Sequence, residues 1–391
     1  MLKAYKYKLK TTVKQRKALL NHFGCCRYIY NWGLERKISQ YKTDKKSLSY
    51  VALAKELTQL KKQEETKWLQ KVAAESLQQS LKHLDAAFKR FFKEKKGFPN
   101  FKKRGCCKET CKFIQHLQID FSLHRVKLPI IGWVNIRKNK QFDCEQCNIK
   151  SMTASMDKCG TIYVSVLIET NEPCKPKTKV CRKTAVGIDM GIKDFVTLSN
   201  GIKYPNKRFL NAESKKLKRL QQRFAKTTIG SRRRERLRLH IAKIYNRIAN
   251  RRSNYIHDIT SSLIKTYDTI CLEDLNIQGM MKNHTLARAI GDVAWHEFKR
   301  QLLYKAEWHG KNVLFINRYM PSSKRCSCCG YEYKRLTLNV RKWTCPECKV
   351  VHDRGINAAL NIKAYAFESL FGEVVPQVSG TTETSGKGNN A

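Results

Sequence analysis

Four cysteines near the C-terminus have the spacing of a metal site. Cys326 and Cys329 form one CxxC pair, and Cys345 and Cys348 form a second, with 15 residues between the pairs. Two such pairs at this separation can place four thiolates tetrahedrally around Zn²⁺. A site whose four positions are all sulfur is closed and structural rather than catalytic. The pattern therefore predicts a structural zinc ribbon over residues 326–349.

Two carboxylates stand at the ends of predicted buried strands. Asp189 ends the apolar run TAVGID ahead of the next glycine, and Glu273 ends the run DTICLE. An acid in such a place is costly without a cation or a polar partner. RNase H-like nucleases hold two Mg²⁺ ions with carboxylates on neighbouring strands, and Mg²⁺ prefers hard oxygen ligands. Each acid taken alone is also compatible with a cap or a salt bridge, but the pair favours a Mg²⁺ site.

The chain is strongly basic, with 78 Lys and Arg against 32 Asp and Glu and a formal net charge of +46. A compact fold with so much like charge repels itself unless a polyanion neutralises it. Nucleic acid is the expected partner, through counterion release at its phosphates. Residues 203–252 hold 18 Lys and Arg against only Glu213 and Glu235, with apolar residues at helical spacing. We interpret this segment as basic helices that bind nucleic acid rather than as a solvated charged face.

Six basic residues are the candidates for contact with phosphate. Five lie in the basic segment and one lies just before the first CxxC pair; they are Arg232, Arg233, Arg234, Arg251, Arg252 and Lys324.

Hydrophobic periodicity predicts the elements that position these residues. Residues 3–9 alternate as a strand, and short strands dominate from Cys111 to Thr170. Prolines and lysines over 173–183 are typical of a linker. Helices are expected over 14–38, 51–61, 68–94, 287–309 and 356–371.

No run of about 18 apolar residues is present, so we expect neither a membrane span nor a membrane partner. The N-terminus MLKAYKYKLK lacks the apolar core of a signal peptide. We expect a cytoplasmic protein, where reduced cysteines favour metal binding over disulfides.

The order of the motifs resembles one family. GIDMGIKDFVTLSNG, YDTICLEDLNIQGM, PSSKRCSCCG, CPEC and NAALNI follow one another as in the TnpB proteins of bacterial insertion sequences, which are relatives of type V CRISPR effectors. The resemblance covers about residues 1–365. It implies a protein that binds a guide RNA from its own transposable element and cleaves double-stranded DNA beside a short adjacent motif.

The resemblance also implies a multidomain α+β architecture. An N-terminal β-barrel, the wedge, carries a helical insertion, and a C-terminal RuvC-type, RNase H-like α/β domain carries the zinc ribbon. The expected ranges are 1–12 and 96–172 for the barrel, 13–95 for the helical recognition domain, 173–183 for the linker, 184–325 and 350–371 for the RuvC-like domain, 326–349 for the ribbon, and 372–391 for a disordered tail.

Carried over by motif, Asp189 is the first catalytic acid and Glu273 the second. The family has its third acid two residues before the Asn of the NAA segment, and this position is Gly355 here. Asp353 lies two residues earlier, but at a helix start that shift turns a side chain to another direction. Displacing a reacting group by ~1 Å can cost ~100-fold in rate.

Two functions therefore stay open, beside a third reading as a decayed transposon passenger with no selected activity. The first is a Mg²⁺-dependent, RNA-guided DNA endonuclease in which Asp353 replaces the missing acid. The second is a nuclease-deficient RNA-guided DNA binder that acts as a transcriptional repressor, since guide pairing and backbone contacts do not need the metal site. The sequence assigns no oligomeric state.

Overall fold

The computed structural model describes residues 1–137, 142, 147–171, 173, 175–337 and 339–371. The predicted disordered tail, 372–391, lies outside these residues. The chain divides into two compact units, Met1–Pro173 and Cys174–Ala391. The division falls at the start of the predicted linker, whose described residues contain no helix or strand. Thr178 nevertheless donates from its backbone N–H to the Gly310 carbonyl oxygen at 2.8 Å, so part of the linker is attached to the second unit.

The first unit combines an antiparallel sheet with three α-helices and a 3₁₀ helix. Its elements are β1 (Leu2–Lys10), α1 (Val13–Asp44), α2 (Tyr50–Leu60), the 3₁₀ helix η1 (Glu64–Lys71), α3 (Ala74–Glu94), β2 (Glu109–Phe113), β3 (Gln118–Asp120), β4 (Arg125–Leu128), β5 (Gly132–Ile136), β6 (Cys147–Met156) and β7 (Ile162–Thr170).

The seven strands run in the order β2-β6-β7-β1-β5-β4-β3. In the described residues β2 and β3 do not pair with each other, so the closed barrel that we expected is not found. Side chains at the start of α3 form hydrogen bonds with the backbone along the outer edge of β2 instead. Ser76 donates from its hydroxyl to the Lys112 carbonyl oxygen at 3.0 Å, and the Glu75 carboxylate accepts from the Ile114 N–H at 3.1 Å. A helix start therefore occupies the edge where a closing strand would lie.

The helical insertion differs from the prediction in one place. The single helix expected over 68–94 is two elements, η1 and α3, separated at Val72 and Ala73. The buried ring of His22 on α1 accepts a hydrogen bond from the Ala73 N–H at 3.2 Å. Burial lowers the pKa of His22, which keeps the ring neutral and able to accept. The break between the two helices thus lies where a distant part of the chain bonds the backbone.

The second unit contains a five-stranded sheet, the helices around it and a small hairpin. Its elements are β8 (Ala185–Met190), β9 (Asp194–Leu198), β10 (Lys203–Pro205), α4 (Phe209–Ala212), α5 (Ser214–Ala225), α6 (Arg232–Thr266), β11 (Thr269–Glu273), α7 (Ile277–Met280), α8 (His284–Val293), α9 (Trp295–His309), β12 (Asn312–Ile316), β13 (Lys342–Thr344), β14 (Val351–Asp353) and α10 (Arg354–Phe371).

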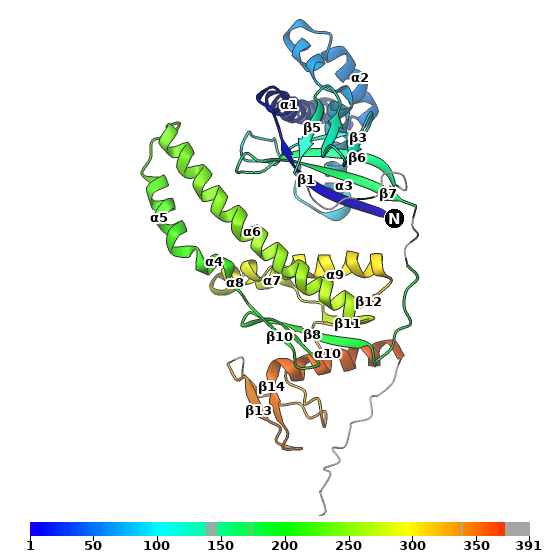
Figure 1. Ribbon diagram of the computed structural model, residues 1–391, viewed down its shortest axis with the longest axis vertical. Coiled ribbons are helices and arrows are strands. Elements are labelled where there is room, and N and C mark those ends of the chain that lie inside the picture. Colours follow the sequence, from blue (N-terminus) through cyan, green and yellow to red (C-terminus); the bar gives the residue numbers. More distant parts are fainter. Residues whose placement is uncertain (138–141, 143–146, 172, 174, 338, 372–391) are drawn as a thin grey trace, which may run out of the picture. The chain divides into compact units, whose positions relative to one another are not determined.

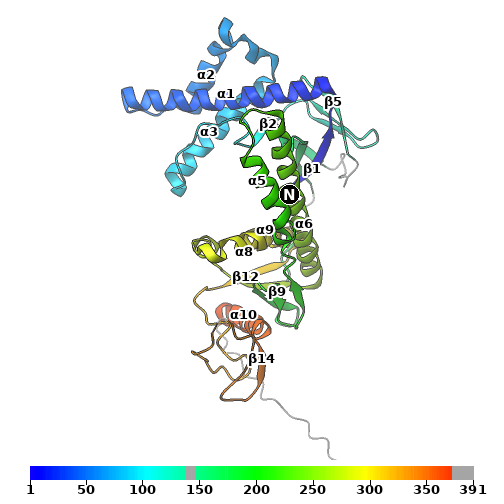
Figure 2. The same cartoon turned by 90° about the vertical axis from the view of Figure 1, so that its left-hand side faces the viewer.

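This sheet lies between two helical layers (Figures 1 and 2). Its order is β10-β9-β8-β11-β12, with β8, β11 and β12 parallel and β9 antiparallel to β8. Ile188 and Leu272 face α6 and α9, and residues such as Cys271 face α10. Because both faces are covered, β8 and β11 have the apolar runs that marked them as buried in the sequence.

The helix expected over 287–309 is also divided. It forms α8 and α9, which meet at Ala294 with a φ of 58°. That left-handed conformation breaks the ladder of helical hydrogen bonds. Among the described residues, no helix has the length and apolar character needed to cross a membrane.

A glycine in β8 sets the distance of α10 from the sheet. A Cβ at position 187 would lie 1.9 Å from the Ala359 carbonyl oxygen and 2.9 Å from Lys363.

We expect Gly187→Ala to lower the free energy of unfolding by more than about 3 kcal/mol, because backbone atoms must move to admit the methyl group. Thermal unfolding measures this. Gly24→Ala in α1 is the control, since a Cβ there meets nothing within 4 Å and should stabilise; equal melting of the two variants would contradict the expectation.

Candidate functional site

The two predicted catalytic acids lie side by side at one edge of the sheet. Ile188 of β8 pairs in parallel register with Leu272 of β11, so Asp189 and Glu273 come next on the two strands. Side chains alternate along a strand. Because Gly187 contacts α10, Asp189 faces α10 as well, and Glu273 shares that face. The parallel pairing thus brings together two acids that are 84 positions apart in the sequence.

Both acids are partly buried, and their charges repel each other. Burial raises the pKa of Asp189 to about 6; Arg354 and Arg341 oppose this shift, and the charges of Asp353 and Asp194 add to it. Burial and the charge of Asp189 raise the pKa of Glu273 to about 7. Such a pair binds a cation favourably, because a divalent ion removes both the repulsion and the loss of solvation. The two arginines were not identified from the sequence.

Asp353 is committed to other contacts. One carboxylate oxygen accepts from the N–H groups of Gly355 and Ile356 at 3.1 and 3.2 Å and so begins α10. The other lies 2.7 Å from the Lys203 ammonium. Burial raises the pKa of Asp353, but Lys203 and the two N–H groups outweigh it and lower the pKa below its ordinary value. Asp353 therefore lies close enough to affect Asp189 while its own oxygens serve the helix start and an ion pair.

Position 355 faces the sheet beside the acid pair. A Cβ on Gly355 would lie 3.1 Å from the hydroxyl oxygen of Thr197 and 3.4 Å from its Cβ and Cγ2. Thr197 is the β9 residue that pairs with Asp189. A side chain at 355 would therefore point to the edge where the two acids lie, and glycine leaves that direction without a carboxylate.

The four predicted zinc ligands form one cluster. Their sulfur atoms all lie within 4.8 Å of one another, with 3.6 Å between Cys326 and Cys348 and 3.5 Å between Cys329 and Cys345. A tetrahedral Zn²⁺ site with Zn–S bonds of ~2.3 Å has sulfur atoms ~3.8 Å apart, so the cluster fits zinc. Cys328, inside the first knuckle, is not part of the cluster.

A histidine supports this cluster. The ring nitrogen Nε2 of His352 on β14 lies 3.0 Å from Cys326 Sγ, and the ring packs on Trp343 of β13. Hydrogen bonds to zinc thiolates from surrounding groups orient the ligands. The pairing of β13 with β14 extends the hairpin of the ribbon to Asp353.

Two buried asparagines join the ribbon to α10. Asn357 accepts from the Ser327 N–H at 2.9 Å and donates to the Arg325 carbonyl oxygen at 2.7 Å. Asn361 donates to the carbonyl oxygens of Ser322 and Arg325 at 2.7 and 2.6 Å. This role was not predicted from the NAALNI motif; two Asn four residues apart on an apolar helix face were the signal for it.

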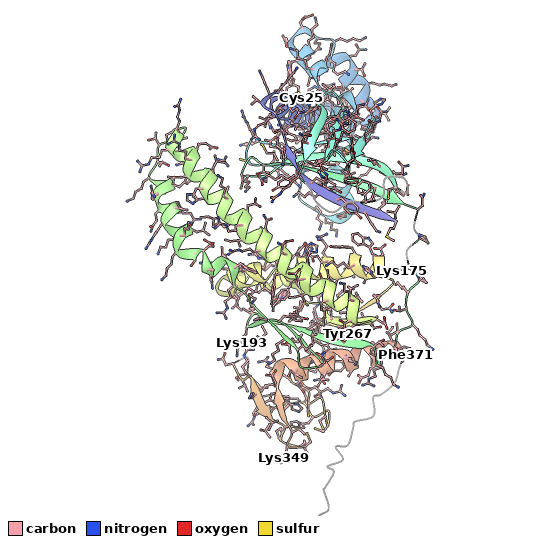
Figure 3. The ribbon with its side chains drawn as sticks, in the orientation of Figure 1. Cys25, Lys175, Lys193, Tyr267, Lys349 and Phe371 are labelled. Carbon is pink, nitrogen blue, oxygen red and sulfur yellow. The ribbon has the colours of Figure 1, made fainter. Side chains whose placement is uncertain are left out.

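The six basic candidates fall into two groups. Arg232, Arg233 and Arg251 on α6 are exposed, and their side chains make no hydrogen bond or ion pair within the described residues. Figure 3 shows nitrogen-tipped side chains along both α5 and α6.

The other three candidates have partners in the protein itself. Arg234 donates to the carbonyl oxygens of Phe224 and Thr227 at 3.1 and 2.9 Å and stacks on the Phe224 ring. Arg252 forms an ion pair with the buried Asp292, and Lys324 donates to the Lys334 carbonyl oxygen at 3.3 Å. These contacts stabilise the fold whether or not nucleic acid is bound.

Comparison with known proteins identifies the family. A family model described as "Probable transposase" matches residues 164–284, and one described as "Cas12f1-like, TNB domain" matches 295–362. A "Putative RNA-guided DNA endonuclease" of Streptomyces pristinaespiralis is 35% identical over 365 residues, covering 93% of this chain and 89% of the relative. The "Putative RNA-guided DNA endonuclease InsQ" of Escherichia coli K12 is 31% identical over 380 residues, covering 93% and 92%. The chain belongs to the TnpB family.

Solved structures show the fold of this TnpB family member. The complex of Cas12f1 with sgRNA and target DNA aligns with a TM-score of 0.50 at 13% identity, over 93% of this chain and 98% of that one. The mini-RNA-guided endonuclease Cas_phi3 aligns with a TM-score of 0.50 at 9% identity, over 94% and 92%. A "Helix-turn-helix domain" model also matches residues 1–46, where the structure has the strand β1 and the single long helix α1.

We expect the zinc content to separate the ligands from their neighbour Cys328. Cys345→Ser should lose most of the bound zinc and unfold the ribbon, because a structural zinc site contributes folding free energy of the order of 10 kcal/mol. Cys328→Ser should keep one zinc per chain. Metal analysis of protein purified without a chelator measures both variants, and equal zinc loss in the two would contradict the assignment of the cluster.

The acid pair predicts a specific dependence of stability on pH. The folded-state pKa of Glu273 is raised, so folding favours the protonated carboxyl group. The contribution of Glu273 to the stability of the fold is therefore full below its unfolded pKa and is lost as pH rises from about 4 through about 7. Without Mg²⁺, Glu273→Gln should melt about 2–4 °C above the natural protein at pH 8, which corresponds to a gain of ~1 kcal/mol in the free energy of unfolding. At pH 5 the difference between the two melting temperatures should be much smaller.

Two controls accompany this measurement. Mg²⁺ should raise the melting temperature of the natural protein at pH 8 and raise that of Glu273→Gln less. Asp274→Asn, one residue on, should not stabilise at either pH, because Lys299 and Arg318 hold the pKa of Asp274 below its ordinary value. The buffers must be Mg²⁺-free by dialysis, since a chelator would also remove zinc. A difference for Glu273→Gln that is equal at pH 5 and pH 8 would contradict the assignment.

Proposed function

We propose that this TnpB family member is an RNA-guided DNA-binding protein of a transposable element, and that its DNA cleavage is weak because its carboxylate site lacks one member. The observation that carries this proposal is the glycine at position 355, beside Asp189 and Glu273. Relatives that cover nearly the whole chain are named as RNA-guided DNA endonucleases, which supports a guide RNA and a double-stranded DNA target as partners. The net charge of +46 suits both partners.

The sheet of the second unit supports an RNase H-like, RuvC-type domain. Three parallel strands flanked by an antiparallel pair, in the order β10-β9-β8-β11-β12, are the arrangement expected for that fold. We assign 184–325 and 350–371 to this domain and 326–349 to the ribbon. In the first unit, the sheet from 1–12 and 96–172 would be the wedge and 13–95 the recognition domain.

Asp189 and Glu273 fit one Mg²⁺ ion. Mg²⁺ keeps several waters and needs one or two carboxylates in addition to substrate phosphate oxygens. When bound, the metal would stabilise charge on the phosphodiester and help to form the attacking hydroxide. The two residues themselves would supply oxygen ligands from neighbouring strands. Arg354 and Arg341 lie near Asp189 and would hold phosphate oxygens at the same edge of the sheet.

A second metal ion would lack its carboxylate. Two-metal sites hold the attacking and the leaving oxygen between the ions. Asp353, the substitute that the sequence offered, has both oxygens engaged by the start of α10 and by Lys203. We therefore expect slow cleavage and intact binding, since binding depends on guide pairing and on contacts such as those of Arg232, Arg233 and Arg251 with phosphate.

The alternative is an endonuclease in which Asp353 acts as the third acid. One observation favours it: the charge of Asp353 raises the pKa of Asp189, so the two carboxylates are near each other. Substrate binding would have to break the Lys203 ion pair to make Asp353 available. If cleavage is absent altogether, occupation of the target would make the protein a transcriptional repressor.

Restoring the acid at position 355 tests the proposal. In protein purified with its co-expressed RNA, Gly355→Asp should bind the target duplex as the natural protein does and cleave it at least ~100-fold faster in Mg²⁺. Gly355→Asn is the matched control, because it makes the same tight contact with Thr197 and brings no charge; it should bind but not gain cleavage. Plasmid cleavage and duplex binding are measured in parallel.

Other results would overturn parts of this proposal. Fast cleavage by the natural protein that Asp353→Ala abolishes would show that Asp353 serves the site. Failure to bind the target duplex with its RNA would remove RNA-guided binding altogether.

A further inference from the structure

A pocket lies at the C-terminal edge of the same sheet; its residues Asp274 and Phe315 are on the α9 side, whereas the acid pair faces α10. It has a volume of about 540 Å³ and is lined by Asp274, Phe315, Ile316, Asn317, Arg318 and Tyr319. Asp274 directly follows Glu273, and its backbone N–H donates to the Ile316 carbonyl oxygen at 3.2 Å. The pocket therefore begins one residue beyond a proposed metal ligand. Its volume is within the range of sites that hold a nucleotide-sized ligand.

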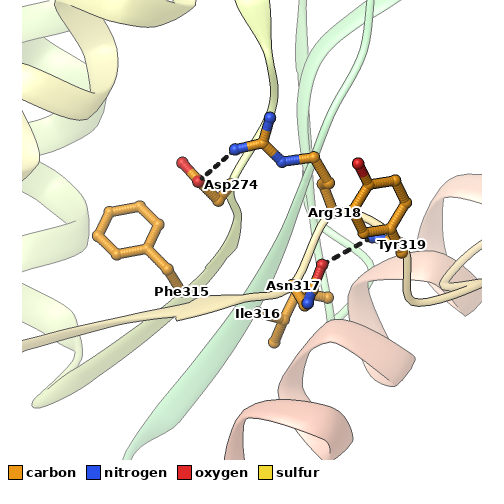
Figure 4. A pocket seen from close by; sticks show the side chains of 6 residues that line it. All are labelled: Asp274, Phe315, Ile316, Asn317, Arg318 and Tyr319. Atoms are coloured by element: carbon orange, nitrogen blue, oxygen red, sulfur yellow. Dashed lines mark hydrogen bonds and ion pairs between the residues drawn. The ribbon is translucent and has the colours of Figure 1, made fainter.

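Aromatic side chains are exposed at this pocket. Tyr319 is 86% exposed and Phe315 36% exposed. Figure 4 shows them on either side of the ion pair between Asp274 and Arg318. The Tyr319 ring makes no ring contact within the described part of the chain, so it contributes nothing visible to the packing of the fold. An exposed aromatic ring beside cations is the arrangement on which nucleobases stack.

The backbone presents Tyr319 in a fixed turn after β12. The Asn317 side-chain oxygen accepts from the Tyr319 N–H, and the Asn317 carbonyl oxygen accepts from the Met320 N–H, both at 3.1 Å. Such hydrogen bonds from an Asn side chain hold a turn in one conformation. The exposed ring therefore stands on a defined support rather than on a loose segment.

Arg318 lines the pocket, and Lys299 lies against its residues Asp274 and Phe315; one carboxylate pairs with both cations. Asp274 lies 2.7 Å from the Lys299 ammonium and 3.0 Å from the Arg318 guanidinium. Lys299 also lies over the Phe315 ring, 4.2 Å from its centre. The three charges sum to +1, and the guanidinium keeps donors that Asp274 does not use. A ligand with an anionic group and a flat aromatic group matches both features.

We propose that this pocket binds an unpaired nucleobase of the DNA strand, stacked on Tyr319, with an adjoining phosphate on Arg318 and Lys299. The inference rests on the proposed function, because guided opening of the duplex supplies the unpaired strand. The pocket would hold the strand at the same edge of the sheet as Asp189 and Glu273. Stacking on an aromatic ring tolerates any base, so the pocket should grip DNA without reading its sequence.

Photocrosslinking tests the pocket directly. Single-stranded DNA of mixed sequence with 5-iodouracil is crosslinked to the full chain purified with its RNA, and the crosslinked peptide is mapped. The crosslink should map to the peptide that holds Tyr319. Tyr319→Leu should lower the affinity for this DNA about 5- to 100-fold, the loss of one stacked base, and Tyr319→Phe should retain it.

Tyr331→Leu is the matched control, because Tyr331 is 37% exposed on the ribbon and does not line the pocket. Its affinity and the zinc content of all variants should equal those of the natural protein. Three results would each overturn the proposal. Tyr319→Leu could bind the DNA as tightly as the natural protein, Tyr331→Leu could lose as much affinity as Tyr319→Leu, or the pocket could prefer RNA of the same sequence.

The outcome separates this proposal from the proposed function. Binding of the target duplex by the natural protein with its RNA is measured in the same samples. If the duplex binds and Tyr319→Leu has no effect on single-stranded DNA, only the pocket is wrong. If the duplex does not bind but the crosslink and the Tyr319 dependence are found, the pocket stands and RNA-guided binding fails.

Discussion

The contact between α10 and β8 at Gly187 determines the geometry of the whole C-terminal site. The Ala359 carbonyl oxygen lies where a side chain on residue 187 would begin, so helix and strand approach more closely than any other residue would allow. That approach places the first turn of α10 against β9, with position 355 at Thr197. It also turns Asn357 and Asn361 toward the ribbon, which they hold through backbone atoms of Arg325 and its neighbours. One glycine thus fixes both the acid site and the attachment of the zinc site.

The charges at the acid site explain how the protein tolerates two partly buried carboxylates. Burial raises both pKa values; the charges of Asp353 and Asp194 add to the rise at Asp189, and the charge of Asp189 adds to the rise at Glu273. Arg354 and Arg341 act in the opposite direction on Asp189. A third acid at position 355 would add to the repulsion in the absence of metal, while glycine leaves the edge of the sheet less negative. A DNA phosphate therefore meets weaker repulsion here than at a three-acid site that holds no metal.

The sequence predicted what depends on local pattern. The four thiols of the ribbon and the positions of Asp189 and Glu273 follow from CxxC spacing and from the ends of apolar runs, and the structure brings each set together. The sequence did not reveal the features that depend on contacts between distant residues. The helix break at Ala73 needs His22, and the engagement of Arg234 and of Asp353 needs partners on other elements. The closed barrel was expected because short strands indicate a sheet but not how its edges end, and here α3 occupies one edge.

The residues proposed for nucleic-acid binding are separate in the structure from those proposed for cleavage. β14 carries His352 toward the zinc cluster and Asp353 toward the start of α10, so adjacent residues connect the two sites. A glycine at position 355 keeps the contacts of His352 and Asp353, because residue 355 donates to Asp353 from its backbone N–H and needs no side chain to do so. The exposed arginines of α6 are likewise independent of that position. Under the proposed function, cleavage would therefore decline through one residue while the surfaces proposed to bind RNA and DNA stay unchanged.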